Sequence, residues 1–189
     1  MTYGERFEEA LTYAARLHRT QRRKGTNIPY VTHLLAVAAI VGENGGTEDE
    51  VIAALLHDAV EDQGGAATRE EIRRRFGDAV ADIVDEVSDT DVVPKPPWRE
   101  RKEAYVARIR DAQRSARLVS AADKLHNARS VLRDLRAEGD ALWRRFTGTK
   151  EETIWYYRAL VDAFRAAGGL EDLVGELDEV VGDIEKHAA

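Results

Sequence analysis

Cysteine is missing from this sequence of 189 residues. Disulfide bonds and thiolate metal ligands are therefore excluded, and any bound metal must be held by histidine and carboxylate side chains. A chain without disulfides is compatible with the cytoplasm, where we expect it to work. Long apolar runs are missing too, since the longest covers residues 34–41 and a membrane helix needs about 18 residues. Because the first residues are charged, we expect neither a signal peptide nor a membrane anchor.

Basic charge is in deficit, with 28 Lys and Arg residues against 35 Asp and Glu residues and a formal net charge of −7. A face that binds a nucleic-acid backbone needs clustered basic side chains. We therefore expect no polymeric nucleic acid as a partner. A small phosphorylated molecule is still compatible with this charge, because it needs only a local basic patch or a bound cation.

Proline is scarce, with four residues, and strand-like alternation of apolar and polar residues is nearly absent. Apolar residues instead recur at spacings of three and four, as in the first helix, which predicts an all-α bundle of about ten helices. We expect these helices near residues 5–20, 33–42, 48–62, 69–76, 78–88, 98–112, 115–137, 141–146, 150–166 and 170–186.

Helix starts and loops are also predicted by the sequence. A threonine followed three residues later by a glutamate is typical of a capping box, and three such pairs occur: Thr47 with Glu50, Thr68 with Glu71, and Thr149 with Glu152. Residues 21–31 and 90–97 are the main irregular stretches and are candidate ligand loops. The length fits one domain over residues 1–189. Its motif-bearing core covers about 5–165, and a C-terminal packing helix covers about 170–186.

Four polar residues follow the apolar stretch at the end of the predicted 48–62 helix: His57, Asp58, Glu61 and Asp62. On one continuous helix, His57 and Glu61 share a face at i,i+4 spacing, and Asp58 and Asp62 share the neighbouring face. Such crowding of carboxylates is repulsive unless a cation compensates it. The end of this helix is therefore a candidate metal site.

Two further candidate ligands come from other helices. His33 begins the second predicted helix, and Asp123 interrupts a run of small apolar residues in the 115–137 helix, on one stripe with Asn127 and Ser130. Nitrogen and oxygen donors of this kind suit manganese or iron, and less clearly zinc or magnesium. A cation lowers the pKa of bound water from about 15.7 toward about 7 and neutralises phosphate charge. Hydrolysis of a phosphate ester or anhydride is the expected reaction.

These residues carry a family resemblance. The order His33, His57-Asp58, Asp123 resembles the HD superfamily. The neighbouring segments resemble the hydrolase domain of RelA/SpoT proteins, in the form of the free-standing small alarmone hydrolases. Those segments are Arg23-Lys24, Pro29-Tyr30, Glu61-Asp62, Phe76-Gly77 and Ala122 to Asn127. The match covers roughly residues 5–165.

The resemblance implies an HD-domain bundle and metal-dependent removal of pyrophosphate from the 3′ position of (p)ppGpp, the nucleotide of the stringent response. It implies that Glu61 and Asp62 place and activate the attacking water. It also implies that Arg23, beside Lys24, packs on the guanine, and that Asn127 bonds the ribose. The implied metal is usually manganese, and its ligands are His33, His57, Asp58 and Asp123.

Two departures from the family bear on the substrate. The loop between Lys24 and Pro29 is one residue longer than in the bifunctional enzymes. Ser120 stands where a lysine often precedes the metal-binding aspartate by three residues, so we expect that one basic contact is either missing or supplied from Lys95 or Lys124. Two alternatives stay open: an HD phosphohydrolase for a nucleoside monophosphate or a 2′- or 3′-phosphorylated cofactor, and a non-catalytic alarmone-binding module.

Other conspicuous residues are not placed in the site. The aromatic run at Trp155, Tyr156 and Tyr157 lies within a helix, and such residues more often belong to a core. His18 is expected on an exposed or half-buried helix, and neither it nor His126 nor His187 is predicted to be a metal ligand.

Overall fold

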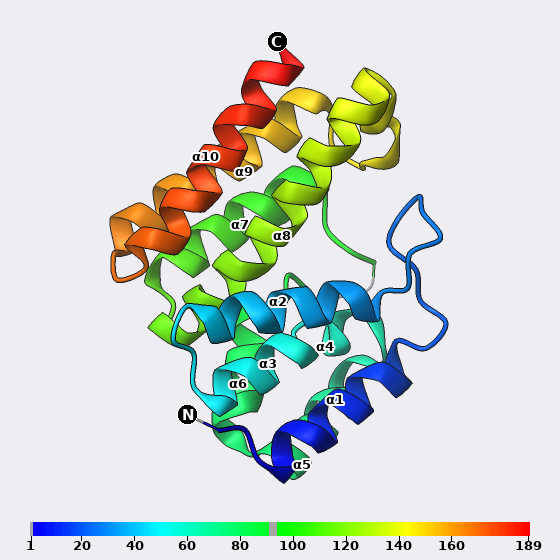
Figure 1. Cartoon of the computed structure of the whole chain (residues 1–189), viewed down its shortest axis with the longest axis vertical. Coiled ribbons are helices and arrows are strands. Elements are labelled where there is room, and N and C mark those ends of the chain that lie inside the picture. The colour runs from blue at the N-terminus through cyan, green and yellow to red at the C-terminus, as the bar shows by residue number, and fades with distance from the viewer. Residues whose placement is uncertain (1, 91–93) are drawn as a thin grey trace.

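The computed structural model describes residues 2–90 and 94–189 and is all-α, as the sequence predicts (Figure 1). The described residues contain no β-strand, and their one β-type pairing is an isolated antiparallel bridge between Arg22 and Pro29. The helices are α1 (Glu5–Leu17), α2 (Val31–Glu43), α3 (Glu48–Leu56), α4 (Ala59–Asp62), α5 (Gly65–Phe76), α6 (Asp78–Val87), α7 (Trp98–Asp111), α8 (Arg114–Glu138), the 3-10 helix η1 (Gly139–Arg145), α9 (Lys150–Ala167) and α10 (Glu171–Ala188).

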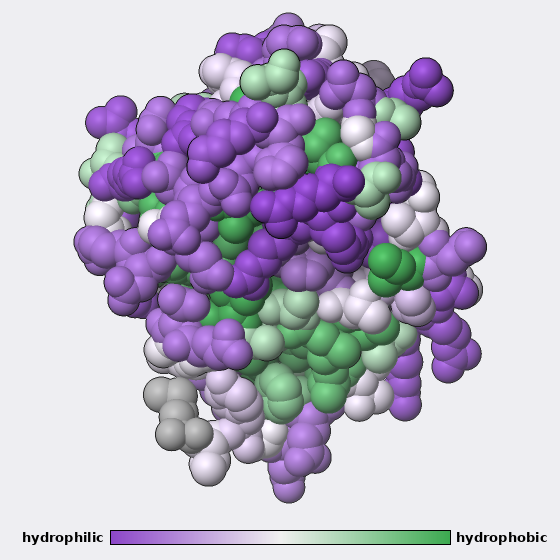
Figure 2. All heavy atoms as spheres, turned by 45° about the horizontal axis from the view of Figure 1, so that its top comes forward, coloured by the Kyte–Doolittle hydropathy of each residue, from purple (hydrophilic) through white to green (hydrophobic). Residues whose placement is uncertain are grey.

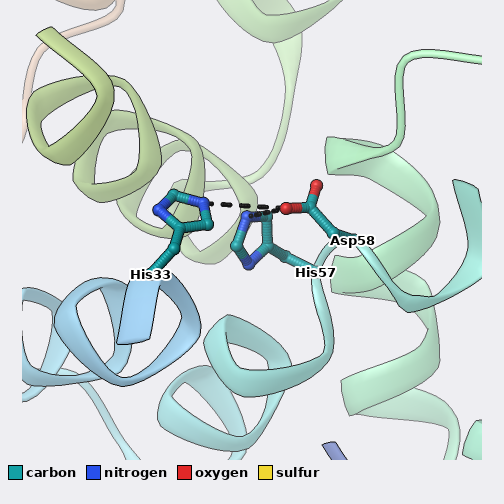
Figure 3. A group of neighbouring side chains, drawn as sticks. All are labelled: His33, His57 and Asp58. Carbon is teal, nitrogen blue, oxygen red and sulfur yellow. Dashed lines mark ion pairs between the residues drawn. The ribbon is translucent and has the colours of Figure 1, made fainter. Parts of the chain in front are cut away.

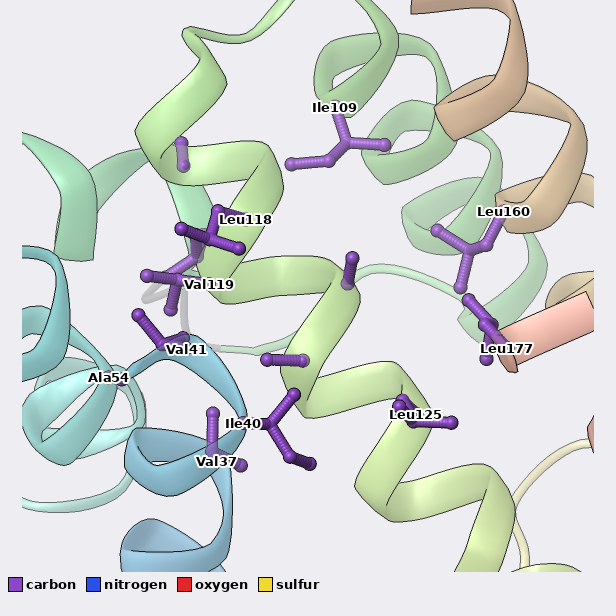
Figure 4. Close-up of a cluster of buried hydrophobic side chains, with 14 of the residues drawn as sticks. Val37, Ile40, Val41, Ala54, Ile109, Leu118, Val119, Leu125, Leu160 and Leu177 are labelled. Carbon is purple, nitrogen blue, oxygen red and sulfur yellow. The ribbon is translucent and has the colours of Figure 1, made fainter. Parts of the chain in front are cut away.

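Helix α8 is the centre of the fold. It packs against α2, α3 and α6 on one side and against α7, α9 and α10 on the other (Figure 1). Its buried residues Leu118, Val119 and Leu125 meet apolar side chains from both groups of helices (Figure 4). Asp123 lies in this buried stretch with only 7% of its surface exposed. A carboxylate in such a place needs compensation, because burying an unpaired charge is very costly.

The predicted 48–62 helix is wrong in one respect: it is broken into α3 and α4. The cause lies at His57, whose Nδ1 donates a hydrogen bond to the Ala54 carbonyl at 2.7 Å. In an uninterrupted helix that carbonyl would accept the amide of Asp58. His57 and Asp58 therefore occupy a turn, although their backbone angles stay in the right-handed helical region.

Two of the three predicted capping boxes are confirmed, at the starts of α3 and α9. The third is wrong, because α5 begins at Gly65 and Thr68 lies inside it, donating its hydroxyl to the Gln63 carbonyl at 2.8 Å. Gly64 and Gly65 have φ angles of 133° and 57°, a region that favours glycine. They turn the chain from α4 straight into α5, so the helix starts earlier than the threonine.

The surface seen in Figure 2 is mostly hydrophilic, and its largest apolar patch lies in the lower centre of the view. Helix α2 contributes no charged side chain between Val31 and Gly42, and its Leu35 is 44% exposed. No helix in the described ranges is long and apolar enough to cross a membrane. Of the predicted 90–97 loop, residues 91–93 lie outside the described residues.

Candidate metal centre and adjoining pocket

The structure brings all four predicted metal ligands together. His33 comes from the first turn of α2, His57 and Asp58 from the turn between α3 and α4, and Asp123 from α8 (Figure 3 draws the first three). His33 Nε2 lies 3.1 Å from Asp123 Oδ1, and His57 Nε2 lies 3.0 Å from Asp58 Oδ2. The distance from His33 Nε2 to Asp58 Oδ2 is 3.6 Å, and so is the distance from His57 Nε2 to Asp123 Oδ1.

The donor set fits a divalent cation. Nε2 of His33 and Nε2 of His57 are buried and have no hydrogen-bond partner among the described residues, although carboxylate oxygens lie beside them. Ligands about 2.1 Å from one ion stand roughly 3.0–3.4 Å apart, close to the spacing seen here. Two imidazole nitrogens and two carboxylates suit a borderline first-row metal.

In both His33 and His57, the second ring nitrogen, Nδ1, has a hydrogen-bond partner that orients the ring. His57 Nδ1 donates to the Ala54 carbonyl, and His33 Nδ1 lies 2.7 Å from His126 Nδ1. Burial, together with the charge of Arg23, lowers the pKa of His126 to about 4, so this ring is neutral at pH 7. Such outer partners fix the orientation of ligating histidines.

The carboxylates are oriented in the same way. Tyr30 donates its hydroxyl to Asp58 Oδ2 at 2.5 Å. Asp123 accepts two hydrogen bonds at 2.6 Å, one from Asn127 Nδ2 to Oδ1 and one from Lys124 Nζ to Oδ2. Both carboxylates are therefore fixed before any ligand arrives.

The ligands are also charge-coupled to one another. Burial alone lowers the pKa of His57, but Asp58 and Asp123 raise it well above its usual value. Burial would raise the pKa of Asp58, but the charge of His57 holds it well below its usual value. The pKa of Asp123 is likewise held well below its usual value, against burial, chiefly by Lys124. Asp58 and Asp123 thus favour a positive charge between them, at the place where a cation would lie.

Glu61 and Asp62 are placed differently from each other. Glu61 lines a small cavity of about 80 Å³ together with His57, Asp58 and Asp123, and its Oε1 accepts from Lys95 Nζ at 2.6 Å. Asp62 does not line this cavity and is exposed. Glu61 thus shares the cavity with His57, in line with their predicted common face, whereas Asp62 does not share it with Asp58.

Asp62 is instead fixed by a chain of side-chain hydrogen bonds. Gln21 Nε2 donates to Asp62 Oδ2 at 2.7 Å, while Gln21 Oε1 accepts from Gln63 and from His18, both at 2.6 Å. His18 is only 2% exposed and stacks on Tyr30, so its predicted position on an exposed or half-buried helix is wrong. The start of the 21–31 loop is thereby tied to the end of α4.

A larger cavity of about 420 Å³ adjoins the metal centre. Its walls include the predicted substrate residues Arg23, Lys24 and Asn127, and Arg23 Nη2 donates to Asn127 Oδ1 at 2.6 Å. Lys24 makes no hydrogen bond or ion pair with any residue in the described part of the chain. The two cavities share the side chains of Lys102, Lys124 and Tyr156. A ligand can therefore extend from the larger cavity to the metal ligands past two lysines.

Sequence reasoning missed several residues of this cavity. Lys102 belongs to the highly charged α7, where nothing in the pattern distinguishes a lysine that turns inward, and its Nζ lies 2.8 Å from Asp89 Oδ2. His126 also lines the larger cavity. Tyr156 and Tyr157 are buried, as predicted for core residues, but they also form part of its wall. Ser120 shares a hydrogen bond of 2.7 Å with the Tyr105 hydroxyl in the small cavity, beside Lys124.

The chain belongs to the HD domain family, whose pattern matches residues 10–153. It is similar to the guanosine-3′,5′-bis(diphosphate) 3′-pyrophosphohydrolase MESH1 of Xenopus tropicalis, at 43% identity over 128 residues, which covers 66% of this chain and 69% of that protein. The MESH1 protein of Drosophila melanogaster, which carries the same enzyme name, is 35% identical over 181 residues and is covered to 92%, with 93% of this chain aligned.

A solved structure agrees with these relatives. It is described as a metazoan orthologue of SpoT that hydrolyses ppGpp and plays a role in starvation responses. This chain and that one cover each other completely, with a TM-score of 0.78 and 31% sequence identity.

Proposed function

We propose that this protein is a metal-dependent phosphohydrolase that removes the 3′-diphosphate of ppGpp and pppGpp, giving GDP or GTP and pyrophosphate. One observation carries the proposal. Two histidines, each with a buried Nε2 that has no hydrogen-bond partner, stand with two carboxylates beside a cavity of about 420 Å³. Two lysines line both this cavity and the smaller cavity at the metal ligands. A small phosphorylated molecule fits this arrangement, because the cavity is basic locally although the chain is acidic overall. The names of the relatives support the same substrate.

His33, His57, Asp58 and Asp123 are the proposed ligands, and manganese is the proposed metal. When bound there, a divalent cation supplies a nucleophile at neutral pH and neutralises phosphate charge. Glu61 lines the cavity beside these ligands and is the proposed acceptor of the proton of the attacking water. Asp62, held by Gln21, is proposed to help place that water.

The substrate is proposed to lie with its nucleoside in the larger cavity. Arg23 packs on the guanine, Asn127 binds the ribose, and Lys24 is free to meet phosphate. Lys102 and Lys124 then face the 3′-diphosphate, since they line both cavities. The water oxygen bonds to the first phosphorus of this diphosphate, the bond from that phosphorus to the 3′ oxygen breaks, and the 3′ oxygen leaves with a proton.

The wider setting is also a proposal. We propose that residues 1–189 form a single domain that works in the cytoplasm and acts in alarmone turnover, as in the stringent response. The continuous packing of α8 against helices from both ends of the chain supports one domain. The lack of cysteine is consistent with the compartment.

A panel of nucleotides incubated with the protein and Mn²⁺ tests the activity. We expect intact pyrophosphate and GDP from ppGpp, separated by chromatography and measured with a phosphate-specific assay. Asp123→Ala is the matched inactive control. Dominant orthophosphate, or turnover of nucleoside monophosphates but not of ppGpp, would point to a general nucleotidase. Tight binding of ppGpp without turnover would point to an alarmone-binding module.

A further inference from the structure

His126 lies between the metal centre and the larger cavity. Its Nδ1 is 2.7 Å from Nδ1 of the proposed ligand His33, and the two rings pack with centroids 4.8 Å apart. The same side chain lines the cavity of about 420 Å³ that also contains Arg23 and Asn127. His126 thus contacts the proposed metal ligand His33 and also lines the cavity proposed for the nucleotide.

The contact between the two nitrogens decides where the protons are. At 2.7 Å one nitrogen must donate and the other must accept. His33 Nε2 is buried without a hydrogen-bond partner and lies 3.1 Å from Asp123 Oδ1, so it is the nitrogen that offers its lone pair to a cation. The proton of His33 is therefore on Nδ1, which donates to His126 Nδ1. Because His126 Nδ1 accepts, the neutral ring of His126 carries its own proton on Nε2.

That second proton is free to meet a ligand. Nε2 lies on the opposite edge of the His126 ring from Nδ1, and it makes no hydrogen bond within residues 2–90 or 94–189. We propose that His126 is a positioning residue with two contacts: Nδ1 orients the metal ligand His33, and Nε2–H donates to an oxygen of the bound nucleotide. The proposal rests on the proposed metal-dependent function and adds a residue that joins its two halves.

Two substitutions separate the contacts. In His126→Asn, the side-chain oxygen can take the place of Nδ1 and still accept from His33, but nothing reaches the position of Nε2. In His126→Gln, the longer amide reaches the position of Nε2 and can still donate to the nucleotide, but the acceptor for His33 is lost. Circular dichroism and thermal melting of both variants check that the fold is retained.

The first readout is the affinity for Mn²⁺ by calorimetry, which needs no substrate. Removing the outer partner of a metal ligand weakens metal affinity by about 10–100-fold, so we expect that loss for His126→Gln and a change of less than about threefold for His126→Asn. The second readout is the KM for ppGpp at saturating Mn²⁺. We expect it to rise by about 3–10-fold in His126→Asn, the effect of one net hydrogen bond, and to stay near the wild-type value in His126→Gln.

Nuclear magnetic resonance of ¹⁵N-histidine-labelled protein loaded with diamagnetic Zn²⁺ gives an independent check. We expect the neutral Nε2–H tautomer at His126. The Nδ1–H tautomer there, wild-type metal affinity in His126→Gln, or an unchanged KM in His126→Asn would each overturn the proposal. A failure to hydrolyse ppGpp would defeat the proposed function instead, and the metal-affinity and tautomer measurements would still decide the role of His126.

Discussion

At the scale of single residues, the proton on His57 has a measurable consequence. Burial alone lowers its pKa, but Asp58 and Asp123 raise it well above the usual value. A metal needs the neutral ring, so binding must displace a proton at pH 7. We expect the affinity for Mn²⁺ to increase with pH below this pKa, by up to about tenfold per pH unit. Calorimetry between pH 6 and 8 in buffers of different ionisation enthalpy measures the affinity and the released proton. A flat profile without proton release would contradict this expectation.

Ligands and the proposed base should respond differently to mutation. His57→Ala or Asp123→Ala should remove both bound metal and activity, because each deletes a donor from the centre. Glu61→Gln should keep the metal but lower kcat by about 10²–10⁴-fold, the usual contribution of a general base. Metal analysis and kinetics on purified variants distinguish the two classes. Glu70→Gln, at an exposed glutamate of α5, is the matched control, and full activity in metal-free Asp123→Ala would rule out the mechanism.

The residue types of the metal centre could be predicted because chemistry restricts them. His57-Asp58 is unusual directly after the apolar run of α3, and Asp123 is unusual directly after the small residues Ala121 and Ala122. The outer partners could not be predicted in the same way. Lys102 is one of many charged residues of α7, and the neighbour of His126 is 93 positions away in the sequence. Such contacts are fixed by how helices pack, which local spacing does not encode.

At the scale of elements, the periodic pattern predicted most helices but not the turn at His57. The apolar run of α3 continues into Ala59 and Val60, so the sequence favours one helix. The break depends on the His57 side chain taking the Ala54 carbonyl, a competition between side chain and backbone that apolar periodicity does not report. This turn aims His57 and Asp58 at α2 and α8, so the prediction failed at the site itself.

The capping box of α9 can be tested by a single substitution. Thr149 accepts from the Glu152 amide, and the Glu152 side chain accepts from the Thr149 amide. Loss of such a cap costs about 0.5–2 kcal/mol, so Thr149→Ala should lower Tm by roughly 1–8 °C in a protein of this size. Thr12→Ala is the matched control, because Thr12 is also exposed but lies inside α1. A change in Tm no larger than that of the control would mean that the cap contributes nothing.

At the scale of the whole molecule, the proposed metal ties distant parts of the chain together. Its four ligands come from α2, from the turn between α3 and α4, and from α8, and α8 in turn packs against α7, α9 and α10 (Figure 1). The unfolded chain does not hold these groups in one place. A cation bound at this centre therefore favours the folded state of the whole bundle, in proportion to its affinity for that state.

Removal of metal should accordingly destabilise the protein. At a free concentration 100 times the dissociation constant, a ligand that binds only the folded state stabilises it by about 2.7 kcal/mol. For a chain of this length each kcal/mol shifts Tm by roughly 2–4 °C, so Mn²⁺ should raise Tm by about 5–11 °C over the value in a chelator. Scanning calorimetry of wild type and Asp123→Ala, each with Mn²⁺ and with EDTA, measures the shift. The variant should show none, because Asp123 is a proposed ligand and also the partner of Lys124. Equal Tm values for the wild-type protein in Mn²⁺ and in EDTA would mean that the four side chains do not form a metal site, however closely they converge.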